Sequence, residues 1–146
     1  MSSTLMLDSG ILGRIAHPRA NVQSVRWLEG RLQDGARIII PEIADYEVRR
    51  SFLLHGLIEA IRSLDRLKLV CEYCPITTDV MLQAAKFWAL SRRLHRPTCD
   101  PKELDGDAIL GAQARKVDAV VVTDNVGHLS LFVQAQTWEE ISSNSI

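Results

Sequence analysis

Short apolar runs alternate along this chain with longer segments of helical spacing, and no other feature of the sequence constrains the fold as strongly. Residues 5–8, 37–40 and 118–123 form short aliphatic runs, as is typical of buried strands. The segment 21–34 instead repeats apolar residues every three or four positions, which indicates a helix. Strands that alternate with helices predict an α/β fold, with a parallel sheet of four or five strands and helices on both faces.

The remaining elements continue this alternation. Pro41 opens a helix that ends at His55-Gly56, because proline is favoured at the first helical position. We further expect, in chain order, a helix over 57–67, a short strand near 75–77, a helix capped by Thr78 or Asp79 that ends near 94, a loop over 95–104, a helix capped by Asp105 that ends near 116, and a short strand near 136–138.

The composition bounds the class of protein. With 146 residues, of which 47% are hydrophobic, the chain suits one folded domain spanning 1–146 rather than a disordered segment. There are 17 basic and 18 acidic residues, which give a net charge of −1, so a surface for nucleic acid must be local. The sequence shows no signal-peptide pattern and no apolar stretch long enough for a membrane helix. Together with three cysteines, an odd count, these features predict a cytoplasmic protein without a membrane partner.

Acidic residues lie at four junctions between the predicted strands and helices. Asp8 ends the first strand, and Asp124 and Asn125 follow the last clear one. Glu47 lies in the helix that follows the second strand, and Asp107 opens a segment rich in small residues that can pack closely on a sheet. Reactive groups gather outside the carboxyl ends of parallel strands, so these side chains can converge. Clustered carboxylates repel unless they are neutralised, and a hard divalent cation prefers their oxygen ligands.

Each acid also has an ordinary structural explanation. Asp8 could cap the following helix, with Ser9 as an alternative cap, and Asp124 could belong to a turn. Glu47 could lie exposed beside a neighbouring arginine. Asp105 competes with Asp107, and we assign Asp105 to capping while keeping it as a reserve metal ligand. Caps and turns explain four acids at four separate junctions less well than one shared metal site does.

A second metal pattern competes with the carboxylates. Cys71 and Cys74 form a C-x-x-C, and His95 and Cys99 follow, so these four residues could hold zinc in a tetrahedral site. Residues 75–94, which are largely helical in character, separate the two halves of this set. We therefore favour ordinary buried or surface thiols over a zinc module.

The order, spacing and total length of these segments resemble the PIN domain, and within it the VapC-like toxin ribonucleases. The resemblance spans nearly the whole chain, and because each motif is short its specificity comes from the set. It rests on Leu5-Met6-Leu7-Asp8, Ile40-Pro41-Glu42-Ile43-Ala44-Asp45-Tyr46-Glu47, Asp107-Ala108-Ile109-Leu110-Gly111-Ala112-Gln113-Ala114 and Val121-Val122-Thr123-Asp124-Asn125. The resemblance implies a PIN-like three-layer sandwich.

The same resemblance implies a metal-dependent endoribonuclease that uses Mg²⁺ or Mn²⁺. It also implies the toxin of a toxin–antitoxin pair, homodimeric and neutralised by a protein antitoxin. By position, Asp8, Glu47 and Asp107 match the acids of the family. The family pattern at the fourth position reads Thr, any residue, then Asp or Asn, which matches Asn125 and leaves Asp124 one residue early, so both stay candidates. The alternative is the same fold without catalysis, a PIN-like module that binds RNA or a partner protein.

RNA contacts would come from local basic residues. Arg96 and Lys102 flank the loop before Asp107 and are the preferred pair for phosphate binding. Other arginines could contribute, although most are expected to lie on solvated helix faces: Arg14, Arg19, Arg49, Arg50, Arg92 and Arg93.

Overall fold

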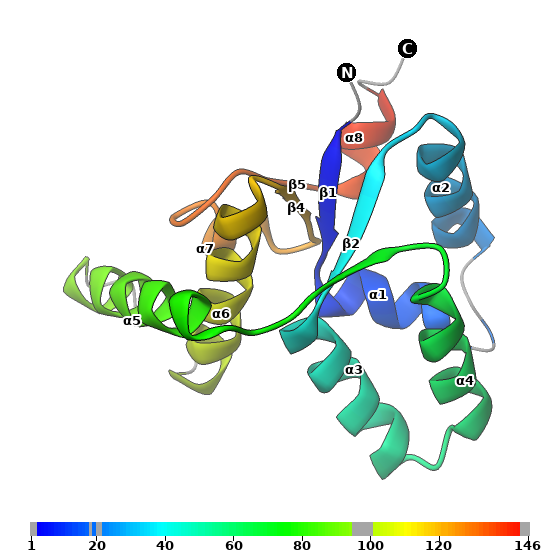
Figure 1. Cartoon of the computed structure of the whole chain (residues 1–146), viewed down its shortest axis with the longest axis horizontal. Coiled ribbons are helices and arrows are strands. Elements are labelled where there is room, and N and C mark those ends of the chain that lie inside the picture. Colours follow the sequence, from blue (N-terminus) through cyan, green and yellow to red (C-terminus); the bar gives the residue numbers. More distant parts are fainter. Residues whose placement is uncertain (1–2, 18, 20–21, 95–100, 144–146) are drawn as a thin grey trace.

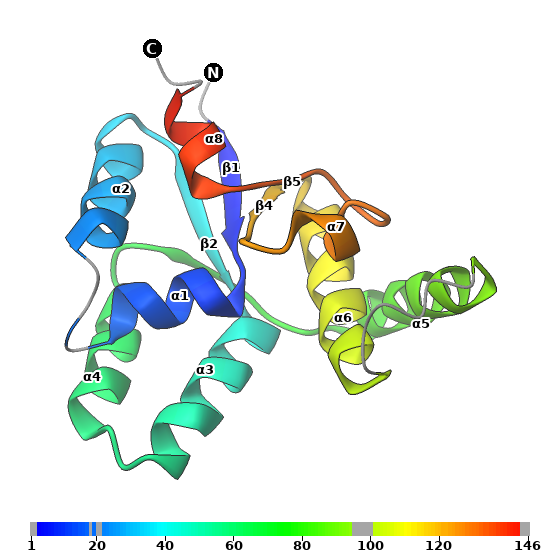
Figure 2. The same cartoon turned by 180° about the vertical axis from the view of Figure 1, so that it is seen from behind.

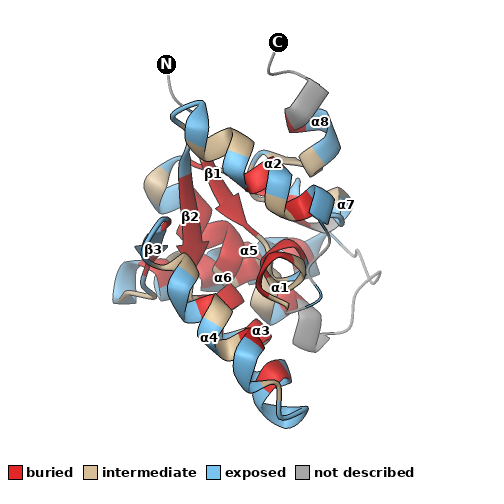
Figure 3. Ribbon diagram, turned by 90° about the vertical axis from the view of Figure 1, so that its right-hand side faces the viewer, coloured by how far each residue is buried: buried red, intermediate tan, exposed pale blue. Residues whose placement is uncertain are grey.

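The computed structural model, which describes residues 3–17, 19, 22–94 and 101–143, is built on one parallel sheet. Its five strands lie in the order β3-β2-β1-β4-β5, and every pair of neighbours is parallel. Figure 1 labels β2, β1, β4 and β5, and Figure 3 labels β3 beside β2. The strands are β1 (Thr4–Leu7), β2 (Arg37–Pro41), β3 (Glu72–Cys74), β4 (Val120–Val122) and β5 (Ala135–Gln136). The parallel α/β sheet expected from the sequence is confirmed.

Helices cover both faces of this sheet. In the described residues they are α1 (Ser9–Ala16), α2 (Val22–Gln33), α3 (Glu42–Leu54), α4 (Ile58–Leu67), α5 (Thr78–Arg93), α6 (Pro101–Val117), α7 (Val126–Leu129) and α8 (Trp138–Ser143). Within the same residues, none of these helices is long and apolar enough to cross a membrane.

Alternating strand residues divide the core between the two faces. Leu5 and Leu7 of β1 pack with apolar residues of α1, α2, α3, α4 and α8. Met6, which points the other way because strand side chains alternate, packs with residues of α6 and α7. The strands β1 and β2 are accordingly buried on both faces (Figure 3). Helix, sheet and helix layers form the three-layer sandwich.

Several boundaries differ from the sequence-based expectation for identifiable reasons. The strand expected near 75–77 lies at β3, because Pro75 has no N–H to donate to a ladder. The last strand ends at Gln136, since Trp138 already begins α8. Helix α5 is capped by the side chain of Thr77, which accepts a hydrogen bond from the Val80 N–H at 3.3 Å, rather than by Thr78 or Asp79.

The start of α6 is the largest correction. The helix begins at Pro101, so residues 101–104 are helical rather than loop, and Asp105 lies inside the helix instead of capping it. Proline suits the first position of a helix because its missing N–H would have no intrahelical partner there. Asp107 consequently lies in the second turn of α6, and not in the first turn where a cap at Asp105 would have placed it.

Candidate functional site

The candidate site lies where the strand order reverses. From β1 the chain moves outward through β2 to β3, and it then crosses the sheet to add β4 and β5 on the other side of β1. In open parallel sheets, ligands bind outside the carboxyl ends of strands at such a reversal. Asp8 directly follows β1 and Thr123 directly follows β4, and the Asp8 N–H donates to the Val122 carbonyl at 3.0 Å. The two strand ends that meet at the reversal therefore both carry polar side chains.

Asp8 is half-buried and held in one orientation by two short hydrogen bonds, to which the Ser9 hydroxyl adds a longer one to Oδ1 at 3.5 Å. Its Oδ1 accepts from the backbone N–H of Ser9 at 2.7 Å, so Asp8 itself, and not Ser9, caps α1. Its Oδ2 accepts from the hydroxyl of Thr123 at 2.6 Å. An ionised carboxylate has about four lone pairs, so Oδ2, which accepts the hydrogen bond from Thr123, can still bind a cation. The cap and the ligand roles considered from the sequence are thus compatible in Asp8.

Thr123 is a site residue that the sequence reasoning left without a role. It is fully buried, its hydroxyl donates to Asp8, and its Oγ1 accepts from the backbone N–H of Asn125 at 3.0 Å. The hydroxyl thereby fixes the end of β4 against the end of β1. The signal was present in the sequence, because a Thr two residues before an Asp or Asn belongs to the pattern that places Asn125.

Glu47 reaches the same end of the sheet from α3. Its side chain is 30% exposed, and the nearest arginine, Arg50, lies 3.8 Å away across a helix turn. Burial and the negative charge of Asp8 both raise the pKa of Glu47, and Arg50 offsets this only in part. A raised pKa from a neighbouring acid indicates carboxylates brought together with too little positive charge. Glu47 is therefore within electrostatic reach of Asp8, and at 30% exposure it is not a freely solvated helix residue.

The third element at this edge is α6. A Cβ built on Gly106 would lie 3.0 Å from Glu47 Oε2, so the backbone of α6 passes close to the Glu47 carboxylate, and a side chain at 106 would press on it. Asp107 is the next residue along α6 and is half-buried, whereas Asp105 is exposed. Helices α3 and α6 and the end of β1 are distant in sequence, and the fold gathers them at one place.

The structure separates the two candidates for the fourth position. The carboxylate of Asp124 is 55% exposed and forms an ion pair with the Arg14 guanidinium of α1. The backbone N–H of Asn125 is bonded to Thr123, which anchors it beside Asp8. Asp124 is therefore engaged by an arginine that the sequence had suggested only as a general phosphate contact.

Other predicted residues are placed as follows. Arg96, and with it His95 and Cys99 of the zinc pattern, lies outside the described residues, as does the side chain of Lys102. Cys71 and Cys74 are buried free thiols, and burial raises the pKa of Cys71 to about 11. A neutral, buried thiol of this kind is a poor nucleophile and a poor metal ligand.

The carboxylates suit a hard cation with an incomplete protein shell. Among the described residues, no three His, Cys, Asp or Glu side chains are gathered as a ready-made ligand set. Mg²⁺ commonly uses only one or two carboxylates and completes its shell with water and substrate phosphates. Asp8 and Glu47, with Asp107 on the adjoining helix, offer oxygen ligands of this kind, and a bound cation would relieve the burial and the repulsion from Asp8 that raise the pKa of Glu47.

Comparisons with known proteins identify the fold. No family model matches the sequence, and no curated protein does. A chain in the crystal structure of VapBC2 from Rickettsia felis, bound to a promoter DNA fragment, is 14% identical with a TM-score of 0.76, over 92% of this chain and 98% of that one. A chain of FitAcB from Neisseria gonorrhoeae is 16% identical with a TM-score of 0.71 over the same shares. A chain of VapBC-1 from nontypeable Haemophilus influenzae is 19% identical with a TM-score of 0.70, over 93% of this chain and 98% of that one.

These likenesses extend over nearly the full length of both partners in each comparison. They confirm the three-layer sandwich with a parallel sheet that the resemblance to PIN domains had predicted. At such low identity the likeness is one of fold, so the chemistry must be argued from the side chains at the strand ends.

Proposed function

Starting from this PIN-like fold, we propose that the chain is a divalent-metal-dependent endoribonuclease and acts as the toxin of a toxin–antitoxin pair. The observation that carries the proposal is the meeting of Asp8, Glu47 and the α6 turn that bears Asp107 at the reversal of strand order. The toxin assignment is supported by the fold shared with the VapBC and FitAcB structures. The proposal includes an RNA substrate, Mg²⁺ or Mn²⁺, a protein antitoxin, a homodimer and a cytoplasmic location.

In this proposal the chain's own residues prepare the site for hydrolysis. Thr123 and the Ser9 N–H fix Asp8, so that its free lone pairs point in a set direction. Glu47, which lies within electrostatic reach of Asp8, orients the water that attacks the phosphodiester. A Mg²⁺ or Mn²⁺ ion bound by these acids supplies the Lewis acidity that polarises the phosphate and lowers the pKa of that water. No serine or cysteine nucleophile is needed, and the expected products carry 5′-phosphate and 3′-hydroxyl ends.

The decisive test replaces Asp8 by Asn. Asparagine caps helices about as well as aspartate, so Asp8→Asn removes the charge while keeping the start of α1. We expect this variant to fold, to lose cleavage of RNA in Mn²⁺, and to lose the rise in melting temperature that Mn²⁺ gives the wild-type chain by preferential binding to the folded state. Glu59→Gln, an exposed acid on α4, is the matched control and should change neither property.

The toxin part of the proposal has its own readout. Expression of the wild-type chain should arrest growth of a bacterial host, and Asp8→Asn should relieve the arrest. If the wild type does not cleave RNA, and it arrests growth no more than Asp8→Asn does, the chain is a binding module with this fold and not a nuclease. If both proteins cleave RNA equally, Asp8 has no catalytic role and the proposed site is wrong. A melting temperature that does not respond to Mg²⁺ or Mn²⁺ would remove the metal from the proposal.

A further inference from the structure

A groove of about 720 Å³ runs between α1 and α3 and begins at the candidate site. Glu47 lies at one side of it, and Phe52 contributes to its apolar lining. The two helices that form its walls lie side by side in both views of the chain (Figures 1 and 2). A strand of substrate that places a phosphate at Asp8 and Glu47 therefore has an open path along this groove.

The groove is basic although the whole chain is not. Its lining holds three arginines, Arg14, Arg19 and Arg50, against the single carboxylate of Glu47, whereas the complete chain has a net charge of −1. Arginine presents a planar fork of N–H donors that fits phosphate oxygens bidentately, so three of them along one groove favour a polyanion. The side chains of Arg14 and Arg50 are 37% and 59% exposed, which leaves them accessible to such a ligand.

His17 adds a neutral donor in the same groove. Its Nδ1 accepts a hydrogen bond from the backbone N–H of Arg19 at 3.1 Å, so the proton of the neutral ring lies on Nε2. The ring also packs edge-on against Phe52, with 6.2 Å between ring centroids. Both contacts fix the end of α1, and the lining of the groove near Arg19 is set before any ligand binds.

Asp124 determines where Arg14 lies. The ion pair joins the end of β4 to α1, so the guanidinium is held between the candidate metal site and the groove. A guanidinium has five N–H donors, and one carboxylate engages at most two of them in a bidentate contact. The remaining donors of Arg14 are left for a second anion.

We propose that the groove between α1 and α3 binds the phosphate backbone of the RNA strand beside the scissile bond, and that Asp124 is a positioning residue that holds Arg14 for this contact. This inference rests on the proposed nuclease function and names the substrate surface of that site. It also assigns the fourth position of the proposed metal site. Asp124 pairs with Arg14, so Asn125, whose backbone N–H is bonded to Thr123, is the candidate metal ligand. The preferred residues for substrate binding are therefore the arginines of this groove, in place of Arg96 and Lys102.

The test measures binding separately from cleavage. Full-length Asp8→Asn protein is titrated with a labelled single-stranded RNA oligonucleotide at several salt concentrations, with fluorescence anisotropy as the readout. In that background, Arg14→Gln, Arg19→Gln and Arg50→Gln should each raise Kd several-fold. Each should also lower the slope of log K against log salt concentration by about 0.7, the value for one phosphate contact to a single strand. Arg62→Gln, on the exposed face of α4, should leave both the Kd and the slope unchanged.

Asp124→Asn tests the positioning role. It should weaken RNA binding as much as Arg14→Gln does, and combining the two should add little, since both remove one contact. With Mn²⁺ alone and the wild-type acids present, Asp124→Asn should keep the metal-induced rise in melting temperature. If Asp124→Asn abolishes that rise and leaves RNA affinity intact, Asp124 is a metal ligand and the positioning role is wrong.

The remaining outcomes separate this inference from the proposed function. Metal-dependent cleavage by the wild type, combined with unchanged affinity and salt slope in all three arginine variants, would overturn the groove while the nuclease stands. RNA binding that follows the arginines, without cleavage by the wild type, would keep the groove and remove the nuclease. If a polyglutamate peptide binds through these arginines and RNA does not, the groove is a site for an acidic protein segment and the inference is overturned. Melting temperatures of every variant check that it is folded.

Discussion

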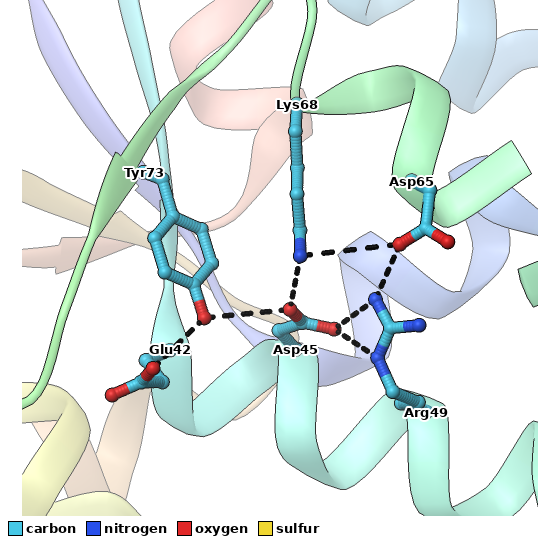
Figure 4. A network of polar contacts seen from close by, with 6 residues as sticks. All are labelled: Glu42, Asp45, Arg49, Asp65, Lys68 and Tyr73. Carbon is cyan, nitrogen blue, oxygen red and sulfur yellow. Dashed lines mark hydrogen bonds and ion pairs between the residues drawn. The ribbon is translucent and has the colours of Figure 1, made fainter.

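Two carboxylates two residues apart on α3, Asp45 and Glu47, lie in contrasting electrostatic surroundings. Asp45 is 5% exposed, and its oxygens lie 3.0 Å from Arg49 and 2.8 Å from Lys68 (Figure 4). Glu47 is paired with Arg50 at the longer distance of 3.8 Å, and burial together with Asp8 raises its pKa. The charge of Asp45 is thus balanced by two nearby cations of the protein, whereas Glu47 has only the more distant Arg50.

The network around Asp45 joins three elements. Tyr73 of β3 donates its hydroxyl to Asp45 at 3.4 Å and to Glu42 at 3.2 Å, and Arg49 also reaches Asp65 of α4 at 2.6 Å (Figure 4). Burial and the two nearby carboxylates raise the pKa of Tyr73, so its hydroxyl stays protonated and can donate. The comparison teaches that a buried acid with its own cations stabilises the fold, whereas one without them has unsatisfied charge available to a ligand.

Asp45→Ala should have the largest effect on stability. It leaves Arg49 and Lys68 without their buried partner, and breaking such a pair typically costs about 3 kcal/mol of unfolding free energy. Urea denaturation monitored by circular dichroism measures the loss. Asp65→Ala, which removes a 54% exposed acid of the same network, should cost less than about 1 kcal/mol. Equal losses in the two variants would show that burial of Asp45 is not what matters.

Glu47→Gln should separate stability from activity. Its RNA cleavage rate should fall about 100-fold, as expected for loss of a group that aligns the attacking water. Its unfolding free energy without metal should not fall, because the substitution removes repulsion from Asp8. Cleavage assays and urea denaturation on the same preparation give both numbers. A loss of stability like that of Asp45→Ala would place Glu47 among the structural acids.

Gly106→Ala probes the contact between α6 and α3. The added methyl would lie 3.0 Å from Glu47 Oε2, so the carboxylate must shift, and we expect reduced cleavage. The free energy of unfolding should change little, because the gain of about 0.5 kcal/mol from alanine in a helix offsets the small shift of a flexible side chain. Gly30→Ala in α2 is the matched control. No atom lies within 4 Å of a Cβ there, so alanine should instead stabilise the helix by about 0.5 kcal/mol. Unchanged cleavage in Gly106→Ala would show that the position of Glu47 is not critical.

Tyr73→Phe should weaken the Asp45 network slightly. The two hydrogen bonds that it removes are long, and Asp45 keeps both of its cations, so we expect a loss of about 1 kcal/mol. Chemical denaturation is again the measurement. RNA cleavage should stay at the wild-type level, and a large drop in activity would mean that the two carboxylate environments are coupled through α3.

The smallest effect concerns pH. Because the pKa of Glu47 is raised in the folded chain above 4.5, its ordinary value, the unfolded chain releases that proton first. Without metal, stability should therefore decline as pH rises from 4.5 through the raised pKa, and Glu47→Gln should lack this decline. Thermal melts across that range compare the two, and identical profiles would show that Glu47 is not perturbed.

The strands and the acids at their ends could be predicted because both depend on local sequence. An aliphatic run that stops at Asp8, or one that stops before Thr123-Asp124-Asn125, indicates a strand end without knowledge of the rest of the fold. The parallel arrangement then places these ends on one edge, and the position of Asp8 next to Thr123 follows from the strand order. The start of α6 was missed because Pro101 can either end a loop or begin a helix, and the local sequence suits both.

Long-range side-chain pairs could not be predicted. Arg14 and Asp124 are 110 positions apart in the chain, and nothing near either residue indicates the other. Asp45 looks like an ordinary acid in the first turn of a helix, where the helix dipole favours negative charge, until α4 and β3 bring Lys68 and Tyr73 to it. Charge pairing of this kind depends on how helices pack, which periodicity does not specify.

The hydrogen bond between Thr123 and Asp8 has a consequence for biosynthesis. Thr123 leaves the ribosome 115 positions after Asp8, and β1 has no β4 to pair with until then. Domains acquire native contacts as their segments emerge. The nascent chain therefore carries an unassembled acidic edge until β4 has emerged, so the proposed ribonuclease site cannot act on the messenger that encodes it before then.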